Sequence, residues 1–112
     1  MTDRVLVTDT LAESGLEILR AADHVELHYR PGLKGEELLS AVAEADALIT
    51  RSGTSVTREL LEAGKRLRVV ARAGVGFDNV DVEEATRRGV LILNAPTANI
   101  LSATEHTFAM IL

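Results

Sequence analysis

Cysteine and tryptophan are absent from this chain of 112 residues, and only 3% of its residues are aromatic. Without cysteine it can form no disulfide and no thiolate, which is typical of a cytosolic protein. The few aromatic side chains cannot line a base-stacking surface, and a net charge of −5 offers no basic footprint for nucleic acid or an anionic membrane. No apolar run approaches the ~20 residues that span a bilayer, and Met-Thr-Asp-Arg does not resemble a signal peptide. We therefore expect a cytoplasmic protein with neither nucleic-acid nor membrane partners.

The residues that are present suffice for one hydrophobic core, because 46% of the chain is hydrophobic and 26% is charged. Short apolar strand patterns alternate strictly with helix patterns, which predicts an α/β domain with a parallel sheet. We expect a flavodoxin-like fold, with five strands in the order 2-1-3-4-5 and helices on both faces. The expected strands are 4–9, 25–29 (an edge strand), 47–50, 69–71 and 90–93, and the expected helices are 11–22, 35–44, one beginning after residue 57, 82–88, and one beginning near residue 103.

Several residues mark where these helices should begin and end. Thr10 and Thr57 are predicted N-caps, because a hydroxyl can accept a hydrogen bond from the first free N–H groups of a helix. Gly64 stands where a C-cap glycine is common, and Gly89 should end the fourth helix. In the helix 35–44, the spacing places Ala43 on the inward face with the leucines and valine.

The last segment begins with a capping box, Ser102-Ala103-Thr104-Glu105, and the sequence stops in the apolar run F-A-M-I-L. We expect a helix that is truncated there. Its apolar face would either fold back over the sheet or be exchanged with a second copy, giving a homodimer.

The stretch 68–99 carries the strongest functional signal. An apolar strand leads into a turn with Gly74 and Gly76, whose missing Cβ atoms let neighbouring N–H groups approach a carboxylate or phosphate. The same glycines could simply make a tight turn, and the pattern alone does not decide. The turn is not the dinucleotide fingerprint G-x-G-x-x-G, because its third glycine position holds Asn79.

Three segments in order, R-A-G-V-G-F-D-N-V-D, E-A-T-R-R-G-V and N-A-P-T-A-N-I-L-S-A-T-E-H, are similar to the D-2-hydroxy acid dehydrogenase family. The resemblance covers the whole chain. It implies that residues 1–99 form a flavodoxin-like substrate domain and that 100–112 begin the helix crossing to a Rossmann domain that binds NAD. The family's catalytic histidine, glutamate and arginine fall after residue 112. The resemblance therefore places no catalytic residue in this chain, and it implies that the chain alone is inactive.

The resemblance also assigns binding roles. It places six residues at the substrate, and two near the cofactor NAD: Arg51, Ser52, Gly74, Val75, Gly76 and Asn99 for the substrate, and Val75 and Thr104 for the cofactor. Members that act on unphosphorylated acids tend to lack the arginine, and a guanidinium fork suits a phosphate. Arg51 thus favours a phosphorylated 2-hydroxy acid, namely oxidation of 3-phosphoglycerate to 3-phosphohydroxypyruvate on the route to L-serine. From the sequence alone, Arg51 could equally be a solvated surface residue.

Other functions stay open or are disfavoured. Another member of the family, such as a glyoxylate or hydroxypyruvate reductase, or an autonomous flavodoxin-like domain without catalysis, would also fit. A signalling receiver is disfavoured, because its acidic cluster, phosphorylated aspartate and lysine would fall on Asp9, Arg51 and Asn94. A flavin carrier would need a Ser/Thr/Gly phosphate loop after the first strand and more aromatic residues.

No metal site is expected, because the three histidines (His24, His28 and His106) do not have metal-ligand spacing. We expect His24 and His28 to be solvated, and His106 to be packed or exposed rather than catalytic. The pairs Glu83-Glu84 and Arg87-Arg88 should make i, i+4 contacts on a helix surface.

Overall fold

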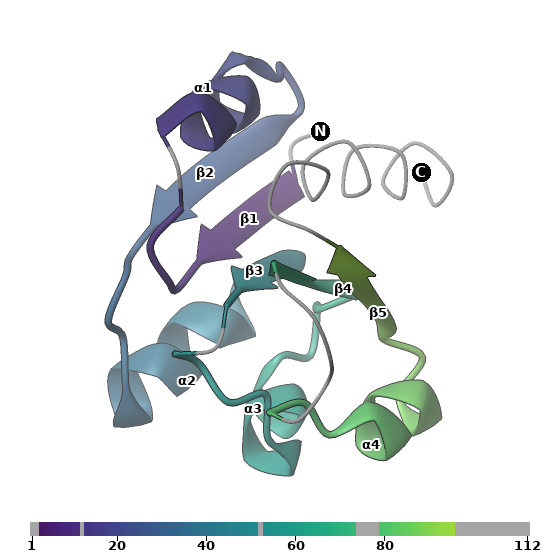
Figure 1. Ribbon diagram of the computed structural model, residues 1–112. Coiled ribbons are helices and arrows are strands. Elements are labelled where there is room, and N and C mark those ends of the chain that lie inside the picture. The colour runs from purple at the N-terminus through teal and green to yellow at the C-terminus, as the bar shows by residue number, and fades with distance from the viewer. Residues whose placement is uncertain (1–2, 12, 52, 74–78, 96–112) are drawn as a thin grey trace.

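The computed structural model describes residues 3–11, 13–51, 53–73 and 79–95. Strands and helices alternate along this part of the chain, as the sequence predicts (Figure 1). The strands are β1 (Asp3–Val7), β2 (Val25–Tyr29), β3 (Ala47–Thr50), β4 (Val69–Ala73) and β5 (Leu91–Ala95), and the helices are α1 (Glu13–Ala21), α2 (Gly35–Ala43), α3 (Arg58–Ala63) and α4 (Val82–Arg87).

The five strands form one parallel sheet in the order β2-β1-β3-β4-β5, which confirms the flavodoxin-like order and places β2 at an edge. β3 lies at the centre, with Leu48 paired to Leu6 of β1 and to Val70 of β4. A parallel sheet buried on both faces requires apolar side chains on both sides of its central strands. The four residues of β3 are all buried, as this position demands.

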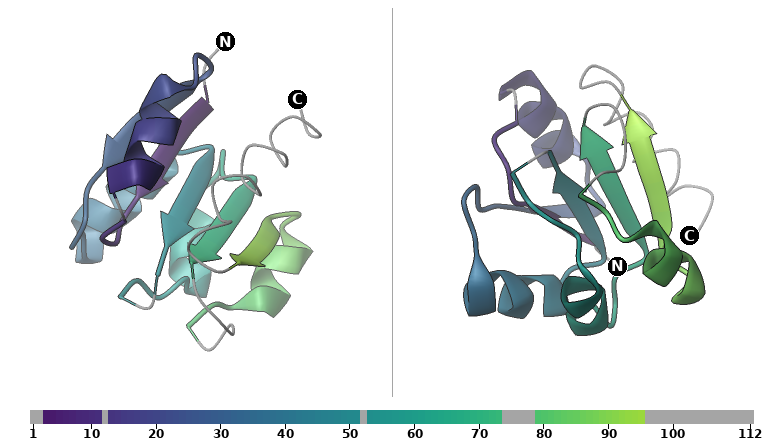
Figure 2. Two further views of the ribbon diagram at one scale, coloured as in Figure 1. Left: turned by 45° about the horizontal axis from the view of Figure 1, so that its top comes forward. Right: turned by 60° about the horizontal axis from the view of Figure 1, so that its bottom comes forward.

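Successive side chains of each strand point to opposite faces, so the sheet has two cores. On one face, Val5, Val7 and Ile49 belong to a cluster that also contains Leu16 and Leu19 of α1. The views of Figure 2 show α1 on this side of the sheet and α2, α3 and α4 on the other. Among the elements that the structure describes, the helices therefore lie on both faces.

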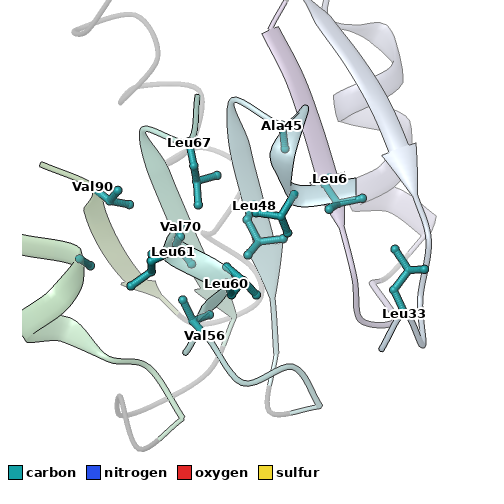
Figure 3. Packing of buried hydrophobic residues seen from close by; sticks show 12 residues of the cluster. Leu6, Leu33, Ala45, Leu48, Val56, Leu60, Leu61, Leu67, Val70 and Val90 are labelled. Carbon is teal, nitrogen blue, oxygen red and sulfur yellow. The ribbon is translucent and has the colours of Figure 1, made fainter. Parts of the chain in front are cut away.

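The second core lies between the sheet and the three helices α2, α3 and α4. Figure 3 shows Leu48 and Val70 of the sheet close to Leu60 and Leu61 of α3. The helix α2 contributes Val42, which is fully buried. Ala43 is exposed, so its predicted inward position is wrong, and the partly buried Ala41 packs against this core instead.

The predicted helix ends are confirmed in part. Thr57 is the N-cap of α3, and its hydroxyl accepts a hydrogen bond from the Leu60 N–H at 3.2 Å. Gly64 is the C-cap of the same helix, although its φ of −82° is not left-handed. Gly89 has a φ of +74° just after α4, the conformation that a terminating glycine supplies.

The start of α1 differs from the prediction. The helix begins at Glu13 rather than near Leu11, so Thr10 is not its N-cap. Leu11 is buried outside the helix, and its N–H lies 3.4 Å from the Tyr29 hydroxyl, which accepts a hydrogen bond from it. The apolar residue that looked like the first helical position is therefore held by a contact with β2.

The bounds of three strands also shift: β1 spans Asp3–Val7 instead of 4–9, β4 spans Val69–Ala73 instead of 69–71, and β5 spans Leu91–Ala95 instead of 90–93. The helix expected from residue 103, its exchange between two copies, and the division at residue 99 lie outside the described residues. None of the helices that the structure describes is long and apolar enough to cross a membrane.

A buried carboxylate fastens the strands at the amino end of the sheet. Asp46, 7% exposed at its side chain, precedes β3 and accepts a hydrogen bond at 2.8 Å from the Arg4 N–H in β1. Its other oxygen lies 3.3 Å from the Arg66 guanidinium. Asp46 therefore fixes the start of β1 against the start of β3.

Candidate functional site

The carboxyl ends of β1, β3 and β4 carry buried polar residues, which follow the apolar Leu6, Leu48 and Val70 on the same face of the sheet. Thr8 follows β1, Thr50 ends β3, and Arg72 lies opposite Thr50 in β4. Thr8 and Thr50 are fully buried, and Arg72 is 8% exposed. In an open parallel sheet, ligands bind outside the carboxyl ends of the strands. This polar layer therefore lies beneath the edge where a ligand site is expected.

Arg51 is the first residue after β3, at this same edge, and it is exposed. Its guanidinium donates one hydrogen bond, from Nη1 to the Thr10 carbonyl at 3.2 Å. Arg4, Arg58 and Arg88 each contact a glutamate. No carboxylate in the described part of the chain pairs with the Arg51 guanidinium, whose charge therefore stays available to an anion.

Asp9, which follows β1, holds the loop that carries Arg51. One carboxylate oxygen accepts the Arg51 backbone N–H at 2.6 Å, and the other accepts the Thr54 hydroxyl at 3.0 Å. The Thr54 hydroxyl also lies 2.9 Å from that of Thr8, so two consecutive residues after β1 hold it. Gly53 faces the carboxylate, and a Cβ there would stand 2.6 Å from Asp9 Oδ1.

Asn79 holds the same loop from the opposite side. Its Nδ2 donates to the Arg51 carbonyl at 3.2 Å and to the Thr54 carbonyl at 2.8 Å. Its Oδ1 accepts a hydrogen bond of 2.7 Å from Nε of the buried Arg72. The amide therefore links the loop after β3 to strand β4.

The backbone reinforces this link. Val56 and Val80 form an isolated parallel bridge beyond the ends of the main strands. The Val56 N–H donates to the Asn79 carbonyl at 2.8 Å, and the Asp81 N–H donates to the Val56 carbonyl at 2.9 Å. The β3–α3 and β4–α4 loops are thus joined by backbone and side-chain hydrogen bonds alike.

Of the predicted site residues, Arg51 is the one whose position the structure gives, and it lies at the expected edge. The others fall outside the described residues: Ser52, Gly74, Val75, Gly76, Asn99 and Thr104. No sequence pattern predicts a role for Thr54 or Arg72. Asp9 and Asn79 stand out in the sequence only where they depart from the receiver and dinucleotide motifs. The sequence does contain a signal for this site, because polar residues stand at the carboxyl ends of the apolar strand patterns.

A group of three charged residues lies at α4 and just after it. Glu84 accepts hydrogen bonds from Arg87 at 2.8 Å and from Arg88 at 2.6 Å, so the predicted i, i+4 contact is present. These hydrogen bonds, first from Arg87 and then from Arg88, hold the pKa of Glu84 below its ordinary value. Glu84 is 8% exposed, and the contact is therefore more buried than a helix-surface pair.

The structure describes two of the three histidines, His24 and His28. His24 is exposed as expected, whereas His28 is partly buried and lies 3.6 Å from Glu26. The pKa of Glu26 is lowered chiefly by Arg4 and to a smaller extent by His28. Among the described residues, no three His, Asp or Glu side chains are grouped to hold a metal ion.

The structure thus shows a flavodoxin-like α/β domain with an exposed arginine at the carboxyl end of its parallel sheet, and no described carboxylate forms an ion pair with that guanidinium. The family model described as D-isomer specific 2-hydroxyacid dehydrogenase, catalytic domain, matches residues 5–110. The chain therefore belongs to the D-isomer specific 2-hydroxyacid dehydrogenase family.

Two similar curated proteins share the name D-3-phosphoglycerate dehydrogenase. The chain is 54% identical over 109 residues to D-3-phosphoglycerate dehydrogenase 2, chloroplastic, of Arabidopsis thaliana, a match that covers 96% of this chain and 17% of the relative. It is also 54% identical over 108 residues to D-3-phosphoglycerate dehydrogenase of Mycobacterium tuberculosis (strain H37Rv), covering 96% of this chain and 20% of the relative. The chain thus spans about a fifth of the length of these relatives.

Solved structures agree on the fold. The PH0520 protein from Pyrococcus horikoshii OT3 has a TM-score of 0.78 and 33% identity, over 85% of this chain and 28% of that one. The NAD+-bound 3-phosphoglycerate dehydrogenase of Entamoeba histolytica has a TM-score of 0.73 and 27% identity, over 99% of this chain and 38% of that one.

Proposed function

We propose that this chain is the substrate-domain segment of an NAD-dependent dehydrogenase that oxidises 3-phosphoglycerate to 3-phosphohydroxypyruvate, a step toward L-serine. The observation that carries the proposal is the Arg51 guanidinium, exposed at the carboxyl edge of the sheet and paired with no described carboxylate. The proposal is supported by the shared name of the curated relatives and by the NAD+-bound neighbour.

The chemistry asked of this segment is binding rather than proton or hydride transfer. A guanidinium can donate two parallel hydrogen bonds to a phosphate, and each such charge-assisted bond is stronger than a neutral one. In our proposal Arg51 and Ser52 bind the phosphate, and the amides of residues 74–76 bind the substrate carboxylate with help from Asn99.

The nicotinamide would lie beside Val75 and Thr104, and when bound it supplies the acceptor for the hydride that leaves C2 of the substrate. The sequence has no G-x-G-x-x-G, since Asn79 occupies its third glycine position, so we assign the dinucleotide site to a separate domain. The acid/base group would also come from that domain. We therefore expect the 112-residue chain alone to produce no NADH from 3-phosphoglycerate.

The decisive experiment compares Arg51→Met with Arg58→Met in the full-length dehydrogenase. Arg58 is an exposed arginine of the neighbouring helix, already paired with Glu62, and serves as the matched control. Losing a charged phosphate contact costs about 1.5–3 kcal/mol, so kcat/KM for 3-phosphoglycerate should fall at least tenfold in Arg51→Met. In Arg51→Met, kcat/KM for D-glycerate, which lacks the phosphate, should fall far less. Arg58→Met should have the kcat/KM of the wild type for both substrates.

Three results would contradict parts of the proposal. An active enzyme whose kcat/KM for 3-phosphoglycerate is the same in Arg51→Met and in wild type would remove Arg51 from the phosphate site. Rapid reduction of glyoxylate or hydroxypyruvate without turnover of 3-phosphoglycerate would favour the reductases of the same family. NADH production by the 112-residue chain alone would contradict the separate catalytic domain.

A further inference from the structure

We infer that Asp9 and Asn79 are positioning residues that clamp the backbone of Arg51 from opposite sides and so set where its guanidinium meets the substrate. This inference rests on the proposed role of Arg51 in phosphate binding. Neither residue needs to touch substrate. Asp9 holds the N–H of Arg51 and Asn79 holds its carbonyl, so both peptide groups that flank its Cα are fixed.

Both carboxylate oxygens of Asp9 accept hydrogen bonds from the loop after β3. They accept the Arg51 N–H and the Thr54 hydroxyl at 2.6 and 3.0 Å, and hydrogen bonds to a charged acceptor are among the stronger ones in proteins. The carboxylate forms no ion pair with the Arg51 guanidinium, so it holds the arginine by its backbone without neutralising it.

The absence of a side chain at Gly53 makes this arrangement possible. A Cβ at position 53 would lie 2.6 Å from Asp9 Oδ1, closer than two such atoms can approach. The φ of Gly53 is not in the left-handed region, so the glycine is required by space rather than by conformation. A substitution there should push the carboxylate away from Arg51 and Thr54.

Asn79 completes the clamp and connects it to the rigid sheet. Its Nδ2 donates hydrogen bonds to the carbonyls of Arg51 and Thr54. Its Oδ1 accepts a hydrogen bond from Arg72, which is buried in β4. A flipped amide would set an oxygen against two carbonyls and a nitrogen against a guanidinium, so its orientation is fixed. Substrate-binding groups held by buried neighbours lose less freedom on binding, which is the benefit of preorganisation.

The clamp itself can be tested by amide hydrogen exchange, without substrate. In the full-length protein, peptides spanning residues 51–54 should exchange at least tenfold faster in Asp9→Ala than in wild type. Asp9→Asn keeps an acceptor for the Arg51 N–H and should show a much smaller increase. Asp23→Ala, which removes an exposed carboxylate from the turn before β2, is the matched control and should leave these peptides unchanged.

The positioning role is tested by kinetics on the same variants. Since a displacement of about 1 Å can cost up to 10²-fold in rate or affinity, we expect Asp9→Ala to raise KM for 3-phosphoglycerate about tenfold, with a smaller change in kcat. Asp9→Asn should recover most of the loss. If Asp9 acts through Arg51, the double variant Asp9→Ala/Arg51→Met should lose little more than Arg51→Met alone.

The outcomes separate the two claims. Unchanged exchange at residues 51–54 in Asp9→Ala would refute the clamp. Faster exchange with an unchanged KM, or fully additive losses in the double variant, would refute the positioning role. An enzyme that does not turn over 3-phosphoglycerate would overturn the proposed function and the positioning role together. That result differs from a failed clamp, because exchange at residues 51–54 would still respond to Asp9→Ala.

Discussion

Two glycines that end helices are expected to respond in opposite ways to the same substitutions. Gly64 follows α3 with a φ of −82°, and a Cβ there would lie 2.9 Å from Val42 Cγ1 and 3.0 Å from Leu67 Cβ. Gly89 follows α4 with a φ of +74°, and a Cβ there would meet nothing within 4 Å. Gly64 is therefore required by packing, and Gly89 by conformation.

The size of each effect follows from this difference. At position 64, overpacking costs about 1–3 kcal/mol, and the stiffer unfolded chain offsets about 0.4–1 of it, leaving roughly 1–2 kcal/mol for Gly64→Ala. Gly64→Asn is bulkier and should cost more. At position 89, alanine should cost about 1 kcal/mol, because L-residues disfavour the left-handed region, whereas asparagine adopts it and should cost only a few tenths.

Urea unfolding of the 112-residue chain, followed by circular dichroism, measures how much stability the alanine and asparagine variants lose at each position. With a slope of about 1–3 kcal/mol/M, a loss of 1 kcal/mol lowers the midpoint by about 0.3–1 M. Trimming one neighbour, as in Val42→Ala, should make Gly64→Ala less costly than it is in the wild type. If Gly64→Asn were more stable than Gly64→Ala, the packing explanation would be wrong, and a left-handed conformation at position 64 would replace it.

Two charged residues give further predictions of stability. Because the pKa of Glu84 is lowered in the folded state, its contribution is present above the ordinary value of 4.5 and is lost as the pH falls through the lowered value. Glu84→Gln should therefore be less stable than wild type at pH 7, and this difference in the free energy of unfolding should become smaller in acid. The exposed control Glu83→Gln should match the wild type at pH 7. Asp46→Ala leaves the Arg4 N–H without its acceptor and should cost about 1–3 kcal/mol by urea unfolding, whereas Asp46→Asn should cost less. Equal losses in the two Asp46 variants would show that the hydrogen bond contributes little.

Much of the fold could be predicted because the local signals agree with one another. β2 and β3 have the bounds that their apolar patterns indicate, and Thr57 caps α3 through its hydroxyl. The start of α1 was missed for a tertiary reason: Leu11 is buried by a contact with Tyr29, and its apolar character imitates a helix position. Hydrophobic periodicity indicates that a residue is buried, but it does not indicate which element packs against it.

The candidate site was predictable to a smaller extent. Arg51 was found through its resemblance to an anion-binding position, and the structure adds that its charge has no partner among the described carboxylates. The roles of Asp9 and Asn79 depend on hydrogen bonds across 42 and 28 positions of the chain. No local pattern contains that information, because it arises only when loops from different strands meet.

The strand order explains why those loops meet. Asp9 follows β1, Arg51 follows β3 and Asn79 follows β4, and β3 lies between the other two strands. Parallel strands bring their carboxyl ends to one edge, so the loop after β3 has the loops after β1 and β4 as its neighbours. In the classical dinucleotide order 3-2-1-4-5-6, β3 would stand at an edge beside β2 alone, and neither contact could form. The flavodoxin-like order is thus a requirement for holding Arg51 from both sides, and the clamp follows from topology as much as from the residues that make it.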